Sequence, residues 1–323
     1  MRSIRLGNSD ENVSALCLGC MYFGSSISEP QSVQLLDFYR EAGGSFLDTA
    51  NNYAYWVKGC EGGESENVLG RWMKAKQNRG DIFLATKVGV NMPPRVPRSL
   101  SKNTIMEQCE QSLQRLQTDH IDLYYAHTDD RATSFDETLE AFTRLVQQGK
   151  VRYIGCSNML AWRIEQAHAI SIQHQWANYC CVQQRHSYVR PKAGIHIFSN
   201  SQVPANGDLL DYASENADTF TIVAYSTLLG GMYAHPEHHI PDNYQPDEYD
   251  SADMQVRLGI LKQIADETHA TPNQIVLAWL MQNVPAMIAL ISSSSLERLK
   301  ENLGAAQISL TSEQLMRLNR ASA

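Results

Sequence analysis

Residues 45–53 read Ser-Phe-Leu-Asp-Thr-Ala-Asn-Asn-Tyr, directly after a pair of glycines. The apolar residues predict a short buried strand that ends at Asp48, and the polar residues that follow predict a loop. Asp48 and Tyr53 therefore stand at the carboxyl end of a strand, where packing requires neither side chain. A carboxylate and a phenol at such a position indicate chemistry, provided that other reactive side chains meet them there.

A regular alternation of strand and helix extends on both sides of this stretch. The predicted strands are 15–18, 45–48, 82–87, 121–127, 151–157, 180–183, 219–225 and 287–291. The predicted helices are 30–41, 64–73, 101–116, 134–148, 160–174, 208–215, 252–268, 271–283, 296–303 and 311–319. Repeated strand-helix units require a parallel sheet, and these strands are too continuously apolar for an antiparallel sheet with one solvated face.

Eight strand-helix units without a linker favour closure of the sheet into a (β/α)8 TIM barrel, which is an α/β fold. We expect one domain over residues 1–323. A strand-like piece at 3–6, separated by a turn from 13–18, predicts a small N-terminal hairpin strand outside the barrel sheet. The residues beyond the usual barrel length fall in long loops on its carboxyl face, at 51–63, 191–207 and 230–250.

The composition is that of a packed globular protein: 43% of the 323 residues are hydrophobic and 19% are charged. The net charge of -8 comes without a cluster of Lys or Arg, so small-molecule chemistry is favoured and no nucleic-acid partner is expected. The sequence has neither the apolar region of a signal peptide nor an apolar run of roughly 18 to 20 residues. We therefore expect a cytoplasmic protein that does not enter a membrane. The sequence does not decide between a monomer and a homo-oligomer.

The cysteines and histidines predict no metal site. The seven cysteines are an odd number spread over predicted strands and helices, which suits reduced thiols better than disulfides. Cys17-Leu-Gly-Cys20 has the C-x-x-C spacing of a redox or zinc motif, but no second pair completes a set of four ligands. His235-Pro-Glu-His-His239 lies in a polar loop without a second cluster. We expect buried structural thiols at Cys17 and Cys20 and no bound metal.

Polar side chains stand at the carboxyl ends of the predicted strands, where the reactive residues of a TIM barrel lie. They are Asp48, Lys87, His127, Ser157, Asn158, Gln183, Tyr225, Ser226, Ser292 and Ser293. Considered singly, such residues have ordinary explanations: a lysine is commonly solvated, a tyrosine lies in the core or at the rim, and an aspartate caps a helix. Their occurrence together at successive strand ends favours a shared site.

Tyr53 and three of these residues fit one mechanism, the delivery of a hydride and a proton to a carbonyl group. Tyr53 can supply the proton if its pKa falls below the usual value near 10, and a drop of about 3 units corresponds to roughly 4 kcal/mol. A cation about 4 Å away supplies on the order of that energy, so we expect Lys87 to lower the pKa of Tyr53. Asp48 would hold Lys87 in place, and His127 would donate a hydrogen bond to the substrate carbonyl.

The sequence resembles the aldo-keto reductases in motifs that follow the family's order over nearly the whole chain. The motifs are Phe46-Leu-Asp-Thr-Ala with Tyr53, Gly62-Gly-Glu-Ser-Glu66, Thr86-Lys87, Asp122-Leu-Tyr-Tyr-Ala-His127, Gly149-Lys-Val-Arg-Tyr-Ile-Gly-Cys-Ser-Asn158 and Tyr225-Ser-Thr-Leu-Leu-Gly230. The resemblance is closer to the branch with bacterial reductases and potassium-channel β subunits than to the mammalian aldose reductases. It implies a barrel with Asp48, Tyr53, Lys87 and His127 as the catalytic tetrad.

The resemblance also implies a site for NADP(H) or NAD(H). The residues implied to contact it are Ser157, Asn158 and Gln183 at the carboxamide, Tyr225 at the nicotinamide ring, Ser226, Leu228 and Gly230 at the pyrophosphate, and Ser293, Arg298, Glu301 and Asn302 at the adenosine end. Ser293 and Arg298 would lie near a 2′-phosphate. The absence of a G-x-G-x-x-G motif agrees with this family, since no Rossmann domain carries the dinucleotide.

Two departures from the family pattern bear on the cofactor and on packing. After the last barrel strand the chain has Ile291-Ser292 where many members have Pro-Gly or Pro-Lys, which removes a possible phosphate-binding lysine. Arg298 remains, and an arginine binds phosphate through paired hydrogen bonds, so NADP(H) is favoured over NAD(H). His186 stands where an aromatic residue often follows the glutamine, which leaves the local packing open.

The expected activity is the NAD(P)H-dependent reduction of an aldehyde or ketone to the alcohol, or the reverse oxidation. Three aromatic residues at the predicted barrel mouth, Tyr22, Tyr55 and Trp56, either pack the loops or line a site for a sugar or an aryl aldehyde. One alternative is a non-enzymatic dinucleotide-binding interaction or sensor protein of the channel β-subunit type. Another is a metal-dependent barrel hydrolase or isomerase, for which these strand ends are a poor metal cage.

Overall fold

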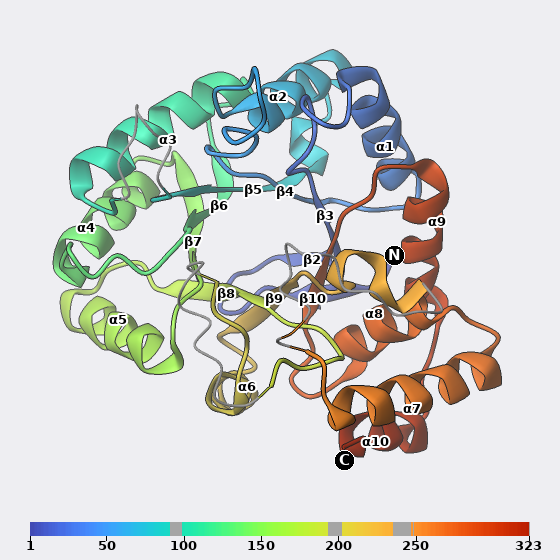
Figure 1. The fold of residues 1–323 in the computed structure, drawn as a ribbon. Helices are drawn as coiled ribbons and strands as arrows, with labels where there is room; N and C mark the ends of the chain where they lie inside the picture. Colours follow the sequence, from blue (N-terminus) through green and yellow to red (C-terminus); the bar gives the residue numbers. More distant parts are fainter. Residues whose placement is uncertain (91–98, 193–201, 235–246, 248, 323) are drawn as a thin grey trace.

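The computed structural model describes residues 1–90, 99–192, 202–234, 247 and 249–322. Eight parallel strands form a closed barrel in the order β10-β3-β4-β5-β6-β7-β8-β9, and helices surround it (Figure 1). The predicted (β/α)8 barrel is confirmed. The barrel strands are β3 (Leu16–Gly19), β4 (Phe46–Asp48), β5 (Phe83–Val88), β6 (Ile121–Ala126), β7 (Val151–Ser157), β8 (Tyr179–Arg185), β9 (Thr221–Tyr225) and β10 (Ile288–Ile291).

Several helices begin at residues whose side chains cap them. The hydroxyl of Thr271, for example, accepts a hydrogen bond from the Gln274 N–H at 3.3 Å, and the Gln274 side chain accepts from the Thr271 N–H at 3.1 Å. The α-helices are α1 (Glu29–Glu41), α2 (Glu64–Lys76), α3 (Lys102–Leu116), α4 (Phe135–Gln147), α5 (Ala161–His174), α6 (Gly207–Glu215), α7 (Ala252–Thr268), α8 (Pro272–Gln282), α9 (Leu296–Gly304) and α10 (Ser312–Arg320). The 3-10 helices are η1 (Arg79–Asp81), η3 (Leu229–Ala234) and η6 (Ala305–Gln307). None of the helices in the described ranges is both long enough and apolar enough to cross a bilayer.

The N-terminal hairpin consists of β1 (Ser3–Arg5) and β2 (Asn12–Ser14). The predicted strand 13–18 is divided, because Ser14 pairs with Ser3 in the hairpin whereas Leu16 pairs with Ala289 of the barrel. The turn between β1 and β2 lies tight against the start of β8: a Cβ atom on Gly7, which has φ +49, would lie 2.0 Å from the backbone oxygen of Cys180. The hairpin therefore covers the amino end of the barrel and leaves the carboxyl end for a site.

Two clusters of buried apolar side chains stabilise the barrel. The larger one fills the space between the strands and the surrounding helices. The smaller one fills the barrel interior beneath the strand ends, where Phe46 and Phe83 pack edge-to-face with ring centroids 5.1 Å apart. The barrel interior is therefore a packed apolar core, and the space for a polar site lies at the carboxyl rim.

Candidate active site

Three neighbouring strands bring Asp48, Lys87 and His127 together. Asp48 is the last residue of β4, Lys87 lies on β5, and His127 directly follows β6. The parallel register aligns Asp48 with Ala85 and Lys87 with Tyr125. Because parallel strands end at one rim, these side chains converge at the carboxyl end of the barrel.

The ammonium group of Lys87 joins these side chains. Its Nζ atom donates hydrogen bonds to Asp48 Oδ1 at 2.5 Å, to the backbone oxygen of Thr49 at 2.7 Å and to the hydroxyl of Tyr53 at 2.9 Å. All three ammonium protons are thereby used. The Lys87 side chain is 0% exposed and that of Asp48 is 1% exposed, so this is a buried ion pair and not a solvated lysine.

Burial has a larger effect on the acidity of Tyr53 than Lys87 has. It raises the pKa of Tyr53 to about 12, and the attraction of Lys87 opposes this only in part. The expected lowering of the pKa is therefore wrong, because removal of the phenolate from water outweighs the attraction of the cation. Burial also raises the pKa of Asp48 against the opposing effect of Lys87. Burial disfavours the Lys87 cation, but Asp48 and Tyr53 together raise the pKa of Lys87 above its ordinary value.

His127 lies beside Tyr53, with ring centroids 6.0 Å apart and ring planes at 76°. Burial, with a contribution from the charge of Lys87, lowers the pKa of His127 well below its ordinary value. The imidazole is therefore neutral at pH 7. Its buried Nδ1 atom has no hydrogen-bond partner within the described part of the chain. A neutral imidazole can donate one hydrogen bond without adding a charge.

The residues implied for the carboxamide lie on the next strands of the barrel. Asn158, which follows β7, uses its whole amide within the protein. Its Nδ2 group donates to Ser157 Oγ at 3.0 Å and to the His127 backbone oxygen at 3.2 Å. Its Oδ1 atom accepts from the Tyr225 hydroxyl at 2.7 Å and from the Val203 N–H at 3.2 Å. The implied contact of Asn158 with a carboxamide stays a prediction, and it requires one of these bonds to open.

Sequence reasoning missed a contact between Gln183 and Asp48. Gln183 Nε2 donates a hydrogen bond to Asp48 Oδ2 at 2.8 Å, so both carboxylate oxygens of Asp48 are bonded. The two residues are 135 positions apart in the chain and lie on β4 and β8, which are not neighbours in the barrel. No spacing of residues in the sequence predicts such a contact.

The turn after β9 contains the residues implied for a pyrophosphate. Ser226, Leu229, Gly230 and Gly231 all have left-handed backbone conformations, with φ of 55°, 45°, 70° and 95°. Within the turn, the Leu229 N–H donates to the Ser226 oxygen at 3.1 Å and the Gly231 N–H donates to the Leu228 oxygen at 2.8 Å. Turns that mix right- and left-handed residues direct backbone N–H groups into a concavity that suits an anion.

The residues implied for the adenosine end lie along and just before α9. Ser293 and Asn302 are buried, whereas Arg298 is exposed. The Glu301 carboxylate accepts a hydrogen bond from the Thr271 hydroxyl at 2.7 Å. Glu301 therefore contributes to the start of α8, and a contact with adenine stays a prediction.

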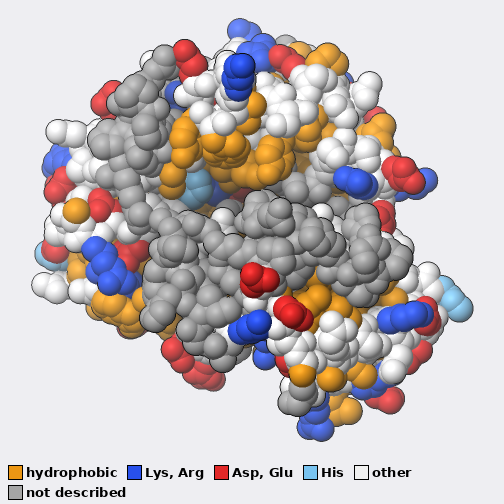
Figure 2. Space-filling model, in the orientation of Figure 1, with side chains coloured by type: hydrophobic (Ala, Val, Ile, Leu, Met, Phe, Trp, Pro, Cys, Tyr) orange, Lys and Arg blue, Asp and Glu red, His pale blue; other side chains and the backbone are white. Residues whose placement is uncertain are grey.

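The aromatic residues predicted at the barrel mouth differ in exposure. Trp56 is 48% exposed, and its ring packs edge-to-face against Tyr53 and Tyr55 with centroid distances of 6.4 and 5.2 Å. Tyr22 is partly buried against the core. Figure 2 shows hydrophobic side chains along one side of a hollow in which a histidine is visible. An apolar surface thus lies directly beside the Tyr53 phenol.

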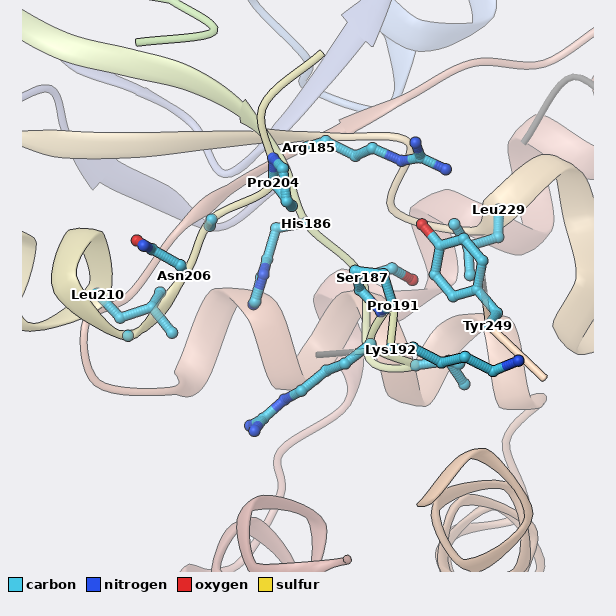
Figure 3. A pocket seen from close by; sticks show the side chains of 14 residues that line it. Arg185, His186, Ser187, Pro191, Lys192, Pro204, Asn206, Leu210, Leu229 and Tyr249 are labelled. Carbon is cyan, nitrogen blue, oxygen red and sulfur yellow. The ribbon is translucent and has the colours of Figure 1, made fainter. Parts of the chain in front are cut away.

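A separate cavity of about 470 Å³ opens beyond the end of β8, and no tetrad residue is among its described lining (Figure 3). Its charged lining residues are Arg185, Arg190 and Lys192. His186 also lines it and stacks on Trp279, with ring centroids 5.7 Å apart and planes at 28°. His186 therefore fills the position of an aromatic residue. Burial, with contributions from Arg190 and Arg257, lowers the pKa of His186 to about 4.

The thiols agree with the sequence. All seven cysteines are free, and Cys17 and Cys20 are buried. Among the described residues, no group of three or more His, Cys, Asp or Glu side chains could hold a metal ion. The segment from His235 to His239 lies outside the described residues.

Comparison with known proteins gives the family. The sequence matches the Aldo/keto reductase family over residues 15–323. It is 33% identical over 308 residues to aldo-keto reductase str7 of Strobilurus tenacellus, which covers 91% of this chain and 82% of that protein. It is 32% identical over 324 residues to the uncharacterized oxidoreductase YrpG of Bacillus subtilis, and the match covers 97% of this chain and 94% of that protein. It is 28% identical over 324 residues to norsolorinic acid reductase of Aspergillus flavus, and the match covers 96% of this chain and 78% of that protein. The chain therefore belongs to the aldo/keto reductase family, whose members generally use NAD(P)H.

Proposed function

We propose that the protein reduces an aldehyde or ketone to the alcohol with NAD(P)H, or catalyses the reverse oxidation, with Tyr53 as general acid. The observation that carries this proposal is the 2.9 Å hydrogen bond from Lys87 Nζ to the Tyr53 hydroxyl, beside the buried ion pair with Asp48. Because Lys87 donates to the hydroxyl oxygen, the phenolic proton is left for another acceptor. A substrate carbonyl oxygen is such an acceptor. A similar protein named as a reductase supports this reaction class.

Tyr53 keeps its proton until the reaction uses it, since its pKa is raised to about 12. As negative charge develops on the carbonyl oxygen, Tyr53 transfers its proton to that oxygen and becomes a phenolate beside the Lys87 ammonium group. The existing hydrogen bond then stabilises the phenolate. Asp48 keeps Lys87 protonated, and the neutral His127 donates a hydrogen bond to the carbonyl. The nicotinamide group, when bound, supplies the hydride.

Two of the predicted cofactor contacts support the proposed dinucleotide site. The left-handed turn at Ser226 and Gly230 suits a pyrophosphate. The exposed guanidinium of Arg298 suits a 2′-phosphate, so we propose NADP(H) in preference to NAD(H). Fluorescence titration of the protein with NADPH and with NADH tests this preference, and equal affinities would contradict it.

We propose that the substrate carbonyl lies over Tyr53 with its remaining atoms against Trp56. The half-exposed indole, packed against Tyr53 and Tyr55, offers a flat apolar surface next to the acid. Such a surface suits an aryl aldehyde or the apolar face of a sugar. Trp56→Ala should raise KM for an aryl aldehyde more than it lowers kcat, and an unchanged KM would remove Trp56 from the substrate site.

Absorbance at 340 nm measures turnover of NADPH or NADH with a panel of sugars, aryl aldehydes and dicarbonyls. Tyr53→Phe should lower kcat at least about a hundredfold, the lower end of what general acid catalysis contributes. Tyr55→Phe is the matched control, because Tyr55 also contacts Trp56, whereas the hydroxyl that accepts a hydrogen bond from Lys87 is that of Tyr53. Equal activity of Tyr53→Phe and the unmutated protein would refute the mechanism. Binding of NADPH without turnover of any carbonyl would favour the dinucleotide-binding sensor.

A further inference from the structure

We propose that Ser65 of α2 is a positioning residue for Lys87 and acts through the main chain of Thr49, a role that rests on the function proposed above. Ser65 belongs to the motif Gly62-Gly-Glu-Ser-Glu66, to which the proposed mechanism assigns no function. Ser65 and Thr49 are both 0% exposed. Hydrogen bonds of known direction connect these two residues to Lys87.

The backbone oxygen of Cys20 determines the direction of these hydrogen bonds. A carbonyl oxygen only accepts, so Ser65 Oγ uses its one proton to donate to Cys20 at 2.7 Å. The Thr49 hydroxyl, which lies 2.7 Å from Ser65 Oγ, must then donate to that atom. The N–H of Thr49 donates to the backbone oxygen of Ala85 on β5 at 2.9 Å. The side-chain bond to α2 and the main-chain bond to β5 together fix the Thr49 carbonyl.

The Thr49 carbonyl is one of the three acceptors of the Lys87 ammonium group. Lys87 Nζ donates to it at 2.7 Å and donates its other two protons to Asp48 and Tyr53. An ammonium group with three fixed acceptors has a defined position and orientation. A displaced Thr49 carbonyl therefore moves Lys87 relative to the Tyr53 hydroxyl. Since Lys87 stabilises the phenolate that forms as Tyr53 gives up its proton, such a displacement slows the reaction.

Glu66, the next residue of the motif, fixes α2 against the strand that carries Lys87. Its carboxylate is 0% exposed and accepts hydrogen bonds from Thr86 Oγ1 at 2.6 Å and from Arg115 Nε at 2.6 Å. Thr86 directly precedes Lys87 on β5. The amino end of α2 is therefore bonded to the main chain beside Lys87, which makes it a rigid support for the contact that Ser65 makes.

The first test measures kcat and KM of Ser65→Ala with saturating NADPH and a carbonyl that the unmutated protein reduces. The substitution removes the acceptor of the Thr49 hydroxyl and the donor to Cys20. We expect kcat to fall about tenfold, as for loss of a buried hydrogen bond. The KM for the carbonyl and the Kd for NADPH should stay within about twofold, because the contact acts on the transition state.

Ser171→Ala is the matched control. Ser171 is 1% exposed and donates to the backbone oxygen of Ala177 at 2.9 Å, but it lies on α5, which contributes no tetrad residue. Its kcat should stay within about twofold. Equal changes of kcat in Ser65→Ala and Ser171→Ala would overturn the proposal, and so would a raised KM or Kd with unchanged kcat in Ser65→Ala.

Thr49→Val tests the same contact with less disturbance of the fold. Valine keeps the shape of the side chain and leaves the hydrogen bond from Ser65 to Cys20 in place. We expect kcat to fall at least about threefold, because only the bond between Thr49 and Ser65 is lost. An unchanged kcat would overturn the proposal, also where Ser65→Ala does not fold.

The second test is a double-mutant cycle of urea unfolding on the cofactor-free protein, and it needs no turnover. The unfolding equilibrium constant of the variant with Ser65→Ala and Lys87→Met should differ at least about fivefold from the product of the two single effects. Thr49→Val takes the place of Ser65→Ala if that variant does not fold. The pair Ser171→Ala and Lys87→Met should agree with the product within about twofold. Agreement in both pairs would overturn the proposal, whereas absence of turnover in the unmutated protein would refute only the proposed function.

Discussion

Replacement of Lys87 by methionine measures what the buried ion pair contributes to folding. The side chains of Lys87 and Asp48 are 0% and 1% exposed, so Lys87→Met leaves an interior carboxylate with Gln183 as its remaining side-chain donor from the barrel strands. Loss of one partner of a buried ion pair costs about 3 to 5 kcal/mol. With an unfolding entropy of about 2.1 cal/mol/K for each of the 323 residues, Tm should fall by about 4 to 7 °C.

Urea unfolding followed by circular dichroism measures this loss, with the m value as a check that the folded state is unchanged. Lys76→Met is the control: Lys76 pairs with Asp37 at 2.8 Å, but the two side chains are 47% and 32% exposed, so about 1 kcal/mol or less is expected. Adding Asp48→Leu to Lys87→Met removes the unpaired buried carboxylate and should recover at least half of the lost free energy of unfolding. A loss below about 1 kcal/mol, equal to that of the control, would refute the description of a buried ion pair.

Three further substitutions test other parts of the structure. His186→Phe keeps an aromatic ring on Trp279 and removes a group whose pKa is lowered to about 4, whereas unfolded histidine titrates near 6.5. The unmutated protein therefore loses stability as the pH falls from about 6.5 toward 4, and the variant should show a smaller loss in urea titrations at pH 7, 5.5 and 4. Arg298→Ala should raise the Kd for NADPH at least about tenfold and that for NADH less than about twofold in fluorescence titrations; parallel changes would exclude a phosphate contact. Gly70→Ala places a Cβ atom 2.3 Å from a backbone oxygen of α3 and should cost about 1 to 3 kcal/mol in urea unfolding, whereas Gly80→Ala, with no atom within 4 Å, should change little.

The barrel follows from the sequence because parallel strands are buried on both faces and leave continuous apolar runs between amphipathic helices. The exact ends of the strands are harder to predict from the sequence, because pairing with other strands determines them. Ser14 falls within an apparent strand but belongs to the hairpin, and its hydroxyl lies 3.1 Å from that of Ser45. The strand predicted at 180–183 continues to Arg185, because its partner β9 pairs Tyr225 with that residue.

The part of the candidate site that lies at the strand ends could be predicted from the sequence. Asp48, Lys87 and His127 end neighbouring strands, so their convergence is a consequence of barrel geometry. The acidity of Tyr53 does not follow, because it depends on how much of the phenol the whole fold removes from water. The bond from Gln183 to Asp48 crosses the barrel mouth, and no local pattern encodes it.

The barrel can close only after the ribosome has made the last strand, because the first barrel strand pairs with it. β3 pairs with β10, and about 270 residues separate them in the chain. At about 5 to 20 residues per second, the ribosome needs roughly 15 to 50 s to make that interval. Throughout this time one edge of β3 presents unpaired backbone groups, which other extended segments can bind. Products of interrupted synthesis should therefore aggregate, and chaperones that cover exposed strand edges should raise the yield of folded protein.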